Sequence, residues 1–309
     1  MQDQITAILS DYDGTLCPTN LVRSKDAAIP VELEDTLWEV SKRIPFCVIS
    51  SKDYHFLRPR TKFAKILSCI LGIETLTLKS QNERIMTYKN NKSNSLKAGC
   101  RDSLDCVEDK HLILDNSKTL RNNSDLLTSL ADSVKLRYKD VVIERKFTSD
   151  KQILAGVTFD YRHTENWSSY KNSLEPFLKQ KVWDARSCSP TTSSEQLLYL
   201  QTYDLHPFLD VYIIKCDKGM AFDYVTSKIS TMTRKENRKG SQKVMYFGDS
   251  ENDNPAFMKA DISVGIRSDD RVEPKLFSER VIKFDQLSIF LKKLIENNFV
   301  FSDDILPTN

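Results

Sequence analysis

Two aspartates, Asp11 and Asp13, stand one residue apart in the run Ala7-Ile8-Leu9-Ser10-Asp11-Tyr12-Asp13-Gly14-Thr15-Leu16. The apolar residues before them are typical of a buried strand, and the Gly-Thr pair after them is typical of a turn. At the carboxyl end of such a strand, both carboxylates project into the crevice where open α/β sheets bind ligands. Two acids this close repel each other unless a hard cation such as Mg²⁺, which takes oxygen ligands, offsets their charge. One carboxylate can then attack a phosphorus atom while the other moves the proton.

Taken alone, this run of ten residues fits other interpretations. Asp-x-Asp-Gly also opens calcium loops, but an EF-hand loop needs a liganding Glu at its twelfth position, where this chain has Val22. A strand that merely ends in a polar turn remains an alternative on these residues.

Three further segments place polar residues at the end of a predicted strand or at the start of a predicted helix. They are Phe46–Lys52, which contains Ser50 and Ser51; Lys215–Ala221, which contains Lys218; and Lys243–Asp253, which contains Asp249 and Asp253. Singly, such residues are common as helix caps, surface lysines or strand ends. Their joint placement at strand ends favours a shared site.

In their order along the chain, the four segments resemble the motifs of the haloacid dehalogenase-like phosphohydrolases. These motifs read Asp-x-Asp-Gly-Thr, then Ser, then Lys-Gly, then Gly-Asp-x-x-x-Asp. The resemblance covers about residues 5–60 and 210–295. It implies a Rossmann-like core and Mg²⁺-dependent phosphoryl transfer through an aspartyl-phosphate.

The resemblance also implies a role for each motif residue. Asp11 is the expected nucleophile and a metal ligand, and Asp13 is the expected general acid and base, whose backbone carbonyl also binds the metal. We expect Asp249 to complete the protein ligands of Mg²⁺, and Asp253 to orient Lys218 or a metal-bound water. The groups expected to hold the phosphoryl group are Ser50, Ser51, Lys218 and the backbone N–H groups of Asp13 and Gly14.

The second aspartate narrows the reaction. ATPase relatives carry Thr at the place of Asp13, and dehalogenase relatives lack an acid there, so Asp13 favours alcohol leaving groups. Three hypotheses stay open: a phosphatase of sugar phosphates, a phosphomannomutase-like enzyme, and a binding protein that keeps the fold without turnover. The intact set of motif residues argues against the third, and release of inorganic phosphate separates the first two.

Composition sets limits on partners and location. The 309 residues are 40% hydrophobic and 28% charged, which is normal for a globular protein, and the formal net charge is +2. We therefore expect neither nucleic acid nor a membrane as partner, whereas the resemblance implies a phosphorylated small molecule. The first eleven residues already hold a core strand, so no signal peptide is expected, and seven scattered cysteines favour a reduced, cytoplasmic protein. The oligomeric state stays open between monomer and homodimer.

Apolar spacing predicts the fold class α/β, with a mainly parallel sheet in a core formed by residues 1–81 and 213–309. The strands expected there are 46–49, 75–78, 244–247, 262–266 and 281–284, and the helices are 30–43, 63–71, 219–229, 255–259 and 287–295. Residues 82–212 are expected to form an inserted α+β cap, and the resemblance implies that a cap at this place in the chain is of the C2 kind. Its expected strands are 111–114, 141–147, 154–161, 197–202 and 209–214, and its helices are 124–136 and 166–179, which suggests two αββ-type units.

The cap should determine the substrate. Glu144-Arg145-Lys146, followed by Tyr161-Arg162, is similar to the cap pattern of trehalose-6-phosphate phosphatases and sucrose-phosphatase-like enzymes. Glu144, Lys146 and Arg162 are therefore expected to bind a sugar, because acids and bases can each hold neighbouring hydroxyls. Strand alternation puts Glu144 and Lys146 on one face and Arg145 on the other. An exposed hairpin with alternating charges is the alternative. The chain also departs from trehalose-phosphatases, which usually have Ser-Gly-Arg where it has Ser50-Ser51-Lys52, so other sugar phosphates stay open.

Overall fold

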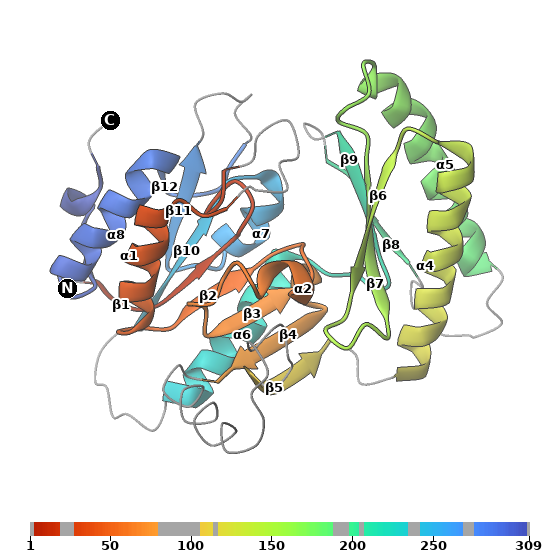
Figure 1. Ribbon diagram of the computed structural model, residues 1–309. Coiled ribbons are helices and arrows are strands. Elements are labelled where there is room, and N and C mark those ends of the chain that lie inside the picture. Colours follow the sequence, from red (N-terminus) through yellow and green to blue (C-terminus); the bar gives the residue numbers. More distant parts are fainter. Residues whose placement is uncertain are drawn as a thin grey trace, which may run out of the picture.

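The computed structural model describes residues 3–18, 28–79, 106–113, 117–187, 198–203, 207–233, 242–267 and 275–307. These residues form two sheets that lie side by side, a large one with nine strands and a small one with four (Figure 1). The large sheet has the order β12-β11-β10-β1-β2-β3-β4-β5, and β13 pairs with β1. Its strands are β1 Asp3–Ser10, β2 Phe46–Ile49, β3 Ile66–Cys69, β4 Glu74–Leu78, β5 Val107–Leu112, β10 Gln242–Gly248, β11 Ile262–Arg267, β12 Arg280–Lys283 and β13 Val300–Phe301.

The strands from β12 to β3 are all parallel, whereas β4, β5 and β13 are antiparallel to their neighbours. This arrangement confirms the predicted α/β class with a mainly parallel sheet. Helices cover both faces, as buried parallel strands require. They are α1 Val31–Ser41 and α8 Leu287–Glu296 on one face, α6 Lys218–Thr233 and α7 Asn254–Phe257 on the other, and the short α2 Tyr54–Leu57.

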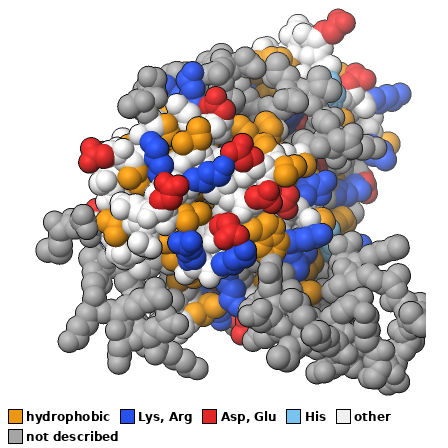
Figure 2. All heavy atoms as spheres, turned by 60° about the vertical axis from the view of Figure 1, so that its left-hand side comes forward, with side chains coloured by type: hydrophobic (Ala, Val, Ile, Leu, Met, Phe, Trp, Pro, Cys, Tyr) orange, Lys and Arg blue, Asp and Glu red, His pale blue; other side chains and the backbone are white. Residues whose placement is uncertain are grey.

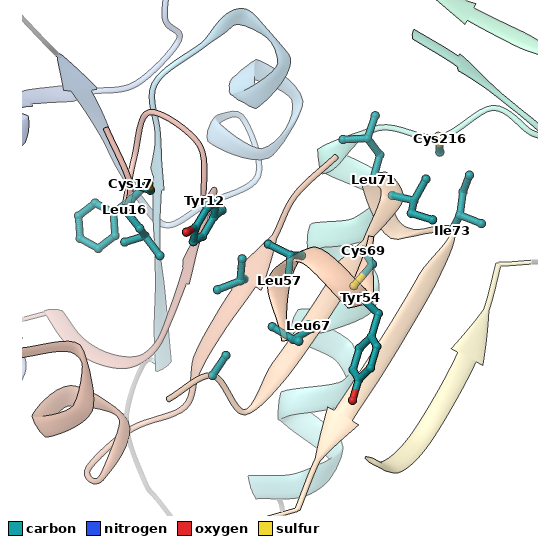
Figure 3. Packing of buried hydrophobic residues seen from close by; sticks show 14 of the residues in the cluster. Tyr12, Leu16, Cys17, Tyr54, Leu57, Leu67, Cys69, Leu71, Ile73 and Cys216 are labelled. Atoms are coloured by element: carbon teal, nitrogen blue, oxygen red, sulfur yellow. The ribbon is translucent and has the colours of Figure 1, made fainter. Parts of the chain in front are cut away.

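Alternation along β1 explains the two layers of core. Ile8 belongs to the hydrophobic cluster that includes Leu37 of α1, whereas Ala7 and Leu9 belong to the cluster that includes Val225 of α6. The loop after β1 is part of the core as well, because Tyr12 and Leu16 are fully buried. Figure 3 shows both residues, with Cys17 beside Leu16, beyond the end of β1. The loop that carries the first motif is therefore fixed by its own apolar side chains.

The small sheet is antiparallel throughout and has the order β6-β7-β9-β8. It is built from two successive helix–strand–strand units: α4 Ser117–Arg137 with β6 Val142–Phe147 and β7 Leu154–Asp160, then α5 Trp167–Ser187 with β8 Tyr199–Gln201 and β9 Phe208–Tyr212. Both helices lie on the side of this sheet that is turned away from the large sheet (Figure 1). The opposite face of the small sheet is therefore turned toward the core strands.

Two expectations need comment. The helix predicted over 63–71 is wrong, because Ile66–Cys69 forms strand β3 between β2 and β4. A continuous apolar run is compatible with a buried strand as well as with a buried helix. Here the segment forms a strand because it pairs with β2 on one side and with β4 on the other. The strand expected near 111–114 is β5, which pairs with β4 of the large sheet although it falls within the range predicted for the cap. The division at residues 82 and 212 stays a prediction.

The surface agrees with the small net charge. On the face shown in Figure 2, acidic and basic side chains are interspersed among hydrophobic and neutral ones. No helix among the described residues is both long enough and apolar enough to cross a membrane. The cysteines in the described segments, Cys17, Cys47, Cys69, Cys106 and Cys216, are free thiols.

Candidate active site

The motif residues lie where parallel strands end side by side. Ser10 of β1 pairs with Phe247 of β10 and with Val48 of β2, and the backbone N–H of Asp11 donates to the carbonyl of Phe247 at 2.9 Å. Asp11, Ser50 and Asp249 therefore follow three adjacent strands at the same edge of the sheet. This edge is where open α/β sheets bind ligands.

A lysine joins two of the buried carboxylates. Lys218, the first residue of α6, lies with its Nζ 2.9 Å from Asp11 Oδ2 and 2.7 Å from Asp253 Oδ1. Burial alone would lower the pKa of Lys218, but the two carboxylates outweigh it and raise that pKa. Burial raises the pKa of Asp11 to about 7. The positive charge of Lys218 lowers this pKa only in part, and the negative charge of Asp253 raises it further. Asp11 is thus a carboxyl group whose ionised form needs more positive charge than Lys218 alone supplies.

Asp253 is already saturated with donors. Its Oδ1 accepts from Lys218 and from Tyr246 Oη at 2.6 Å. Its Oδ2 accepts from the backbone N–H groups of Asp249 and Ser250 and from Ser250 Oγ, at 3.2, 3.1 and 3.0 Å. Such a carboxylate orients its neighbours, as a residue behind the metal ligands does.

The cluster fits a divalent cation. Asp11, Asp249 and Asp253 each offer an oxygen, and these oxygens lie within 4.8 Å of one another. Because Asp253 is occupied by its donors, Asp11 and Asp249 are the two side chains best placed to bind metal. Gly14 makes room for Asp249: its φ is +81°, and a Cβ at this position would lie 1.9 Å from Asp249 Oδ2. Thr15 Oγ1 donates to the other oxygen, Asp249 Oδ1, at 3.1 Å. The oxygen-rich donor set and the space kept by Gly14 suit Mg²⁺.

Asp13 faces the small sheet. Its Oδ2 lies 3.7 Å from Lys52 Nζ, and the same Nζ donates to both Glu144 oxygens at 2.9 and 3.2 Å. Lys52 follows β2, whereas Glu144 belongs to β6. This chain of charges links the first motif, at the edge of the large sheet, to strand β6 of the small sheet.

The expected hairpin forms, and its faces are as predicted. β6 pairs antiparallel with β7, so that Glu144 lies opposite Thr158. Arg145 points the other way and pairs with Asp132 of α4 at 2.6 Å. Lys146 is 2% exposed and lies on the Glu144 face, where its Nζ is 3.3 Å from Asp210 Oδ1 of β9.

The remaining candidates are placed less uniformly. Ser50 is buried, and its Oγ accepts the backbone N–H of Lys52 at 3.2 Å, so its proton can still be donated to a phosphoryl oxygen. Ser51 is half-buried next to it. Arg162 pairs with Asp160 at 3.0 Å and stacks near the Phe208 ring, at the end of β7 away from the β6–β7 turn. The sugar-binding role of Arg162 stays a prediction.

Two residues at this site were not predicted from the sequence. Lys52 was noted only as a departure from a family motif, and Asp210 was not singled out. Asp210 also accepts from Thr158 Oγ1 and, at 2.8 Å, from Tyr203 Oη. The alternation of β9 does place Asp210 and Tyr212 on one face, which was an available signal.

Comparison with solved structures identifies the class of fold. The chain is similar to the C-terminal domain of the C. albicans trehalose-6-phosphate phosphatase, with TM-score 0.64 and 13% identity over 95% of this chain and 93% of that one. A trehalose-6-phosphate phosphatase related protein gives TM-score 0.55 and 13% identity over 94% and 97% of the two chains. The Aspergillus fumigatus trehalose-6-phosphate phosphatase gives 0.51 and 15% over 95% and 94%. No family model and no curated protein sequence matches the chain. The fold is thus the one that the sequence resemblance implies, shared with phosphatases over nearly the whole chain.

Proposed function

We propose that this protein is a Mg²⁺-dependent phosphomonoester hydrolase that acts on a sugar phosphate through an aspartyl-phosphate on Asp11. One observation carries the proposal: Asp11 and Asp249 lie within reach of one cation, and Lys218 lies 2.9 Å from Asp11. This arrangement combines a nucleophilic carboxylate, a metal site and a buried ammonium group. Phosphoryl transfer needs these parts, since it depends mostly on positioning and on neutralising charge.

The chain's own residues account for the steps. Asp11 Oδ attacks the phosphorus and the ester oxygen leaves, so a P–O bond to Asp11 forms as the bond to the alcohol breaks. Asp13, on the side that faces the cap, gives its proton to the leaving oxygen. In the second half it takes a proton from the attacking water, which releases phosphate and restores Asp11. Lys218 and the Ser50 hydroxyl hold the equatorial oxygens of the phosphoryl group.

A bound Mg²⁺ would be held by Asp11, Asp249 and the backbone carbonyl of Asp13, and it would neutralise phosphoryl charge. Asp253 keeps Lys218 and the loop of Asp249 in place. Because the pKa of Asp11 lies at about 7 in the protein alone, additional positive charge beside it favours the ionised nucleophile.

The substrate class rests on the cap. The face of the small sheet that is turned toward the core carries Glu144, Lys146 and Asp210, which are polar groups suited to sugar hydroxyls. Glu144 already reaches Lys52 and, through it, the neighbourhood of Asp13. The names of the similar structures, two trehalose-6-phosphate phosphatases and a trehalose-6-phosphate phosphatase related protein, support a sugar phosphate. The predicted division into a core of residues 1–81 and 213–309 and a cap of 82–212 is part of this proposal.

A phosphate-release screen tests the proposal. Purified protein with Mg²⁺ is offered trehalose 6-phosphate, sucrose 6-phosphate, mannosyl-glycerate and glucosyl-glycerate phosphates, glucose 6-phosphate, mannose 6-phosphate and p-nitrophenyl phosphate. We expect release from p-nitrophenyl phosphate and a higher kcat/KM for at least one sugar phosphate. Isomerisation of mannose 6-phosphate without release would instead identify a mutase. No turnover of any ester would favour a binding protein on this fold.

A further inference from the structure

Another buried carboxylate lies outside the catalytic group, at the base of the cap. Glu74 is the first residue of β4 and is fully buried. Its oxygens accept three hydrogen bonds from one residue of the β6–β7 turn: from the backbone N–H of Ser149 at 3.1 and 2.8 Å and from Ser149 Oγ at 2.7 Å. A buried carboxylate is costly unless donors surround it, so these contacts hold the turn firmly.

The same turn is held by a lysine of the large sheet. Lys110 of β5 lies 3.0 Å from Glu74 Oε1 and 3.0 Å from Asp150 Oδ2. Burial alone would lower the pKa of Lys110, but the carboxylates of Glu74 and Asp150 outweigh it and raise that pKa. Lys110 therefore stays charged and links the buried acid of the core to the turn of the cap.

The turn itself is well defined. The Thr148 N–H donates to the Ile153 carbonyl at 3.0 Å, and Asp150 accepts from Thr148 Oγ1 and from the Gln152 N–H at 2.7 and 3.1 Å. One step along β6, the backbone N–H of Phe147 donates to Asp53 Oδ2 at 3.3 Å. The hairpin thus meets the core at its turn, through two acids that neither bind metal nor touch the reacting atoms.

A fixed turn determines where Glu144 lies. From Ser149 to Glu144 the paired strand acts as a lever roughly 17 Å long at ~3.3 Å per residue, so a tilt of about 5° at the turn would move Glu144 by about 1.5 Å. A displacement of that size exceeds the tolerance of the 2.9 Å bond between Glu144 and Lys52. A small tilt of the β6–β7 turn therefore produces a larger displacement of Glu144, which faces Asp13.

We propose that Glu74 is a positioning residue, which anchors the β6–β7 turn to the core and thereby holds Glu144 over Lys52 and Asp13. Movement of the cap then takes place as a pivot about Ser149 and not as a lift of the whole hairpin. The effect on catalysis rests on the proposed function, whereas the anchoring itself does not.

Hydrogen–deuterium exchange tests the anchor without any substrate. In Glu74→Gln the charge facing Lys110 and one acceptor oxygen are lost, so peptides within 142–160 should exchange about ten-fold faster. Peptides from β1 and β10 should keep their rates. The matched control is Glu108→Gln on neighbouring β5, whose carboxylate is 54% exposed and pairs with Lys65 at 3.3 Å; it should change neither region. Unchanged exchange of the hairpin in Glu74→Gln would overturn the proposal. If that variant does not fold, Ser149→Ala, which removes only the 2.7 Å bond, should show the same change at smaller size.

Kinetics then test positioning. The substrate is the sugar phosphate that wild-type protein hydrolyses best in the screen, and p-nitrophenyl phosphate is the reference. Glu74→Gln should lower the kcat/KM of the sugar phosphate relative to that of the reference ester by about ten-fold, through a higher KM for the sugar phosphate. The kcat/KM of the reference ester should stay within about two-fold of the wild-type value. In a Glu144→Ala background, Glu74→Gln should lower the ratio little further. This ratio is independent of the fraction of folded enzyme. A loosened hairpin with an unchanged ratio would make Glu74 merely structural and refute its positioning role. If wild-type protein releases no phosphate at all, the proposed function fails, while the exchange data still decide the anchor.

Discussion

Replacing Gly14 by alanine should disable the metal site. The new Cβ would lie 1.9 Å from Asp249 Oδ2, where real Cβ contacts start at about 3.0 Å, so the carboxylate must move by about 1 Å or the loop must shift. A misplacement of about 1 Å in a catalytic group can cost ~100-fold in rate, or about 2.7 kcal/mol of transition-state stabilisation. The left-handed backbone at φ +81° adds roughly 1–2 kcal/mol of lost folding stability. We therefore expect Gly14→Ala to fold, to need far more Mg²⁺ and to turn over about 100-fold more slowly.

A control variant separates the backbone effect from the clash. Asn298 also has a positive φ, 51°, but it lies in the loop before β13, beside the amino end of β1 and away from the motif residues. Asn298→Ala should carry a backbone cost of similar order and retain wild-type activity. The assay is phosphate release from p-nitrophenyl phosphate over a Mg²⁺ titration, with urea unfolding for stability. Near wild-type turnover of Gly14→Ala at moderate Mg²⁺ would refute the assignment of Asp249 as a metal ligand held by the Gly14 cradle.

Three further outcomes follow from the same geometry. Asp11→Asn should lose nearly all turnover, because an amide does not attack phosphorus; retention of more than a few per cent of phosphate release would exclude the covalent mechanism. EDTA should abolish activity and Mg²⁺ should restore it; full activity in excess chelator would rule out the metal. Asp249→Ala should weaken activation by Mg²⁺ far more than it changes the midpoint of urea unfolding. Glu144→Ala and Lys146→Ala should each raise KM for the sugar phosphate by about ten-fold and affect hydrolysis of p-nitrophenyl phosphate much less. Arg145→Ala, which loses the pairing with Asp132, should leave KM for the sugar phosphate nearly unchanged. The reverse pattern in steady-state kinetics would contradict the assigned faces of β6.

The edge of the sheet that carries the candidate site was predictable because its signals are local. Asp11, Ser50 and Asp249 each follow a short apolar run, and parallel strands bring their carboxyl ends to one edge. The strand at Phe46–Ile49 was predicted with the bounds that the structure has. The side-chain faces of β6 follow from strand alternation alone, which is why Glu144 and Arg145 separate as expected.

Other features depend on contacts that the sequence does not display. The segment Ile66–Cys69 is apolar at every position, so only its place between β2 and β4 distinguishes strand from helix. Glu74 meets Ser149 across 75 residues, and Lys146 meets Asp210 across 64. In isolation each of these charged residues is typical of a solvated surface. Glu74 finds its partner in the turn of the small sheet, and Lys146 finds its partner on another strand of its own sheet, so neither contact can be read from the local sequence.

The position of β1 has a consequence for how the chain is made. β1 lies between β2 and β10, and Thr15 bonds to Asp249 across 234 residues. During synthesis from the amino end, all residues of the small sheet are present before β10 has been made. The two helix–strand–strand units of the small sheet can therefore assemble from a contiguous stretch of chain. β1 meanwhile has one side without its strand partner, and its apolar residues stay available to other chains until Gly248 has been added. The N-terminal aspartates thus enter a site only when the last third of the protein arrives, and until then one edge of β1 has no strand partner.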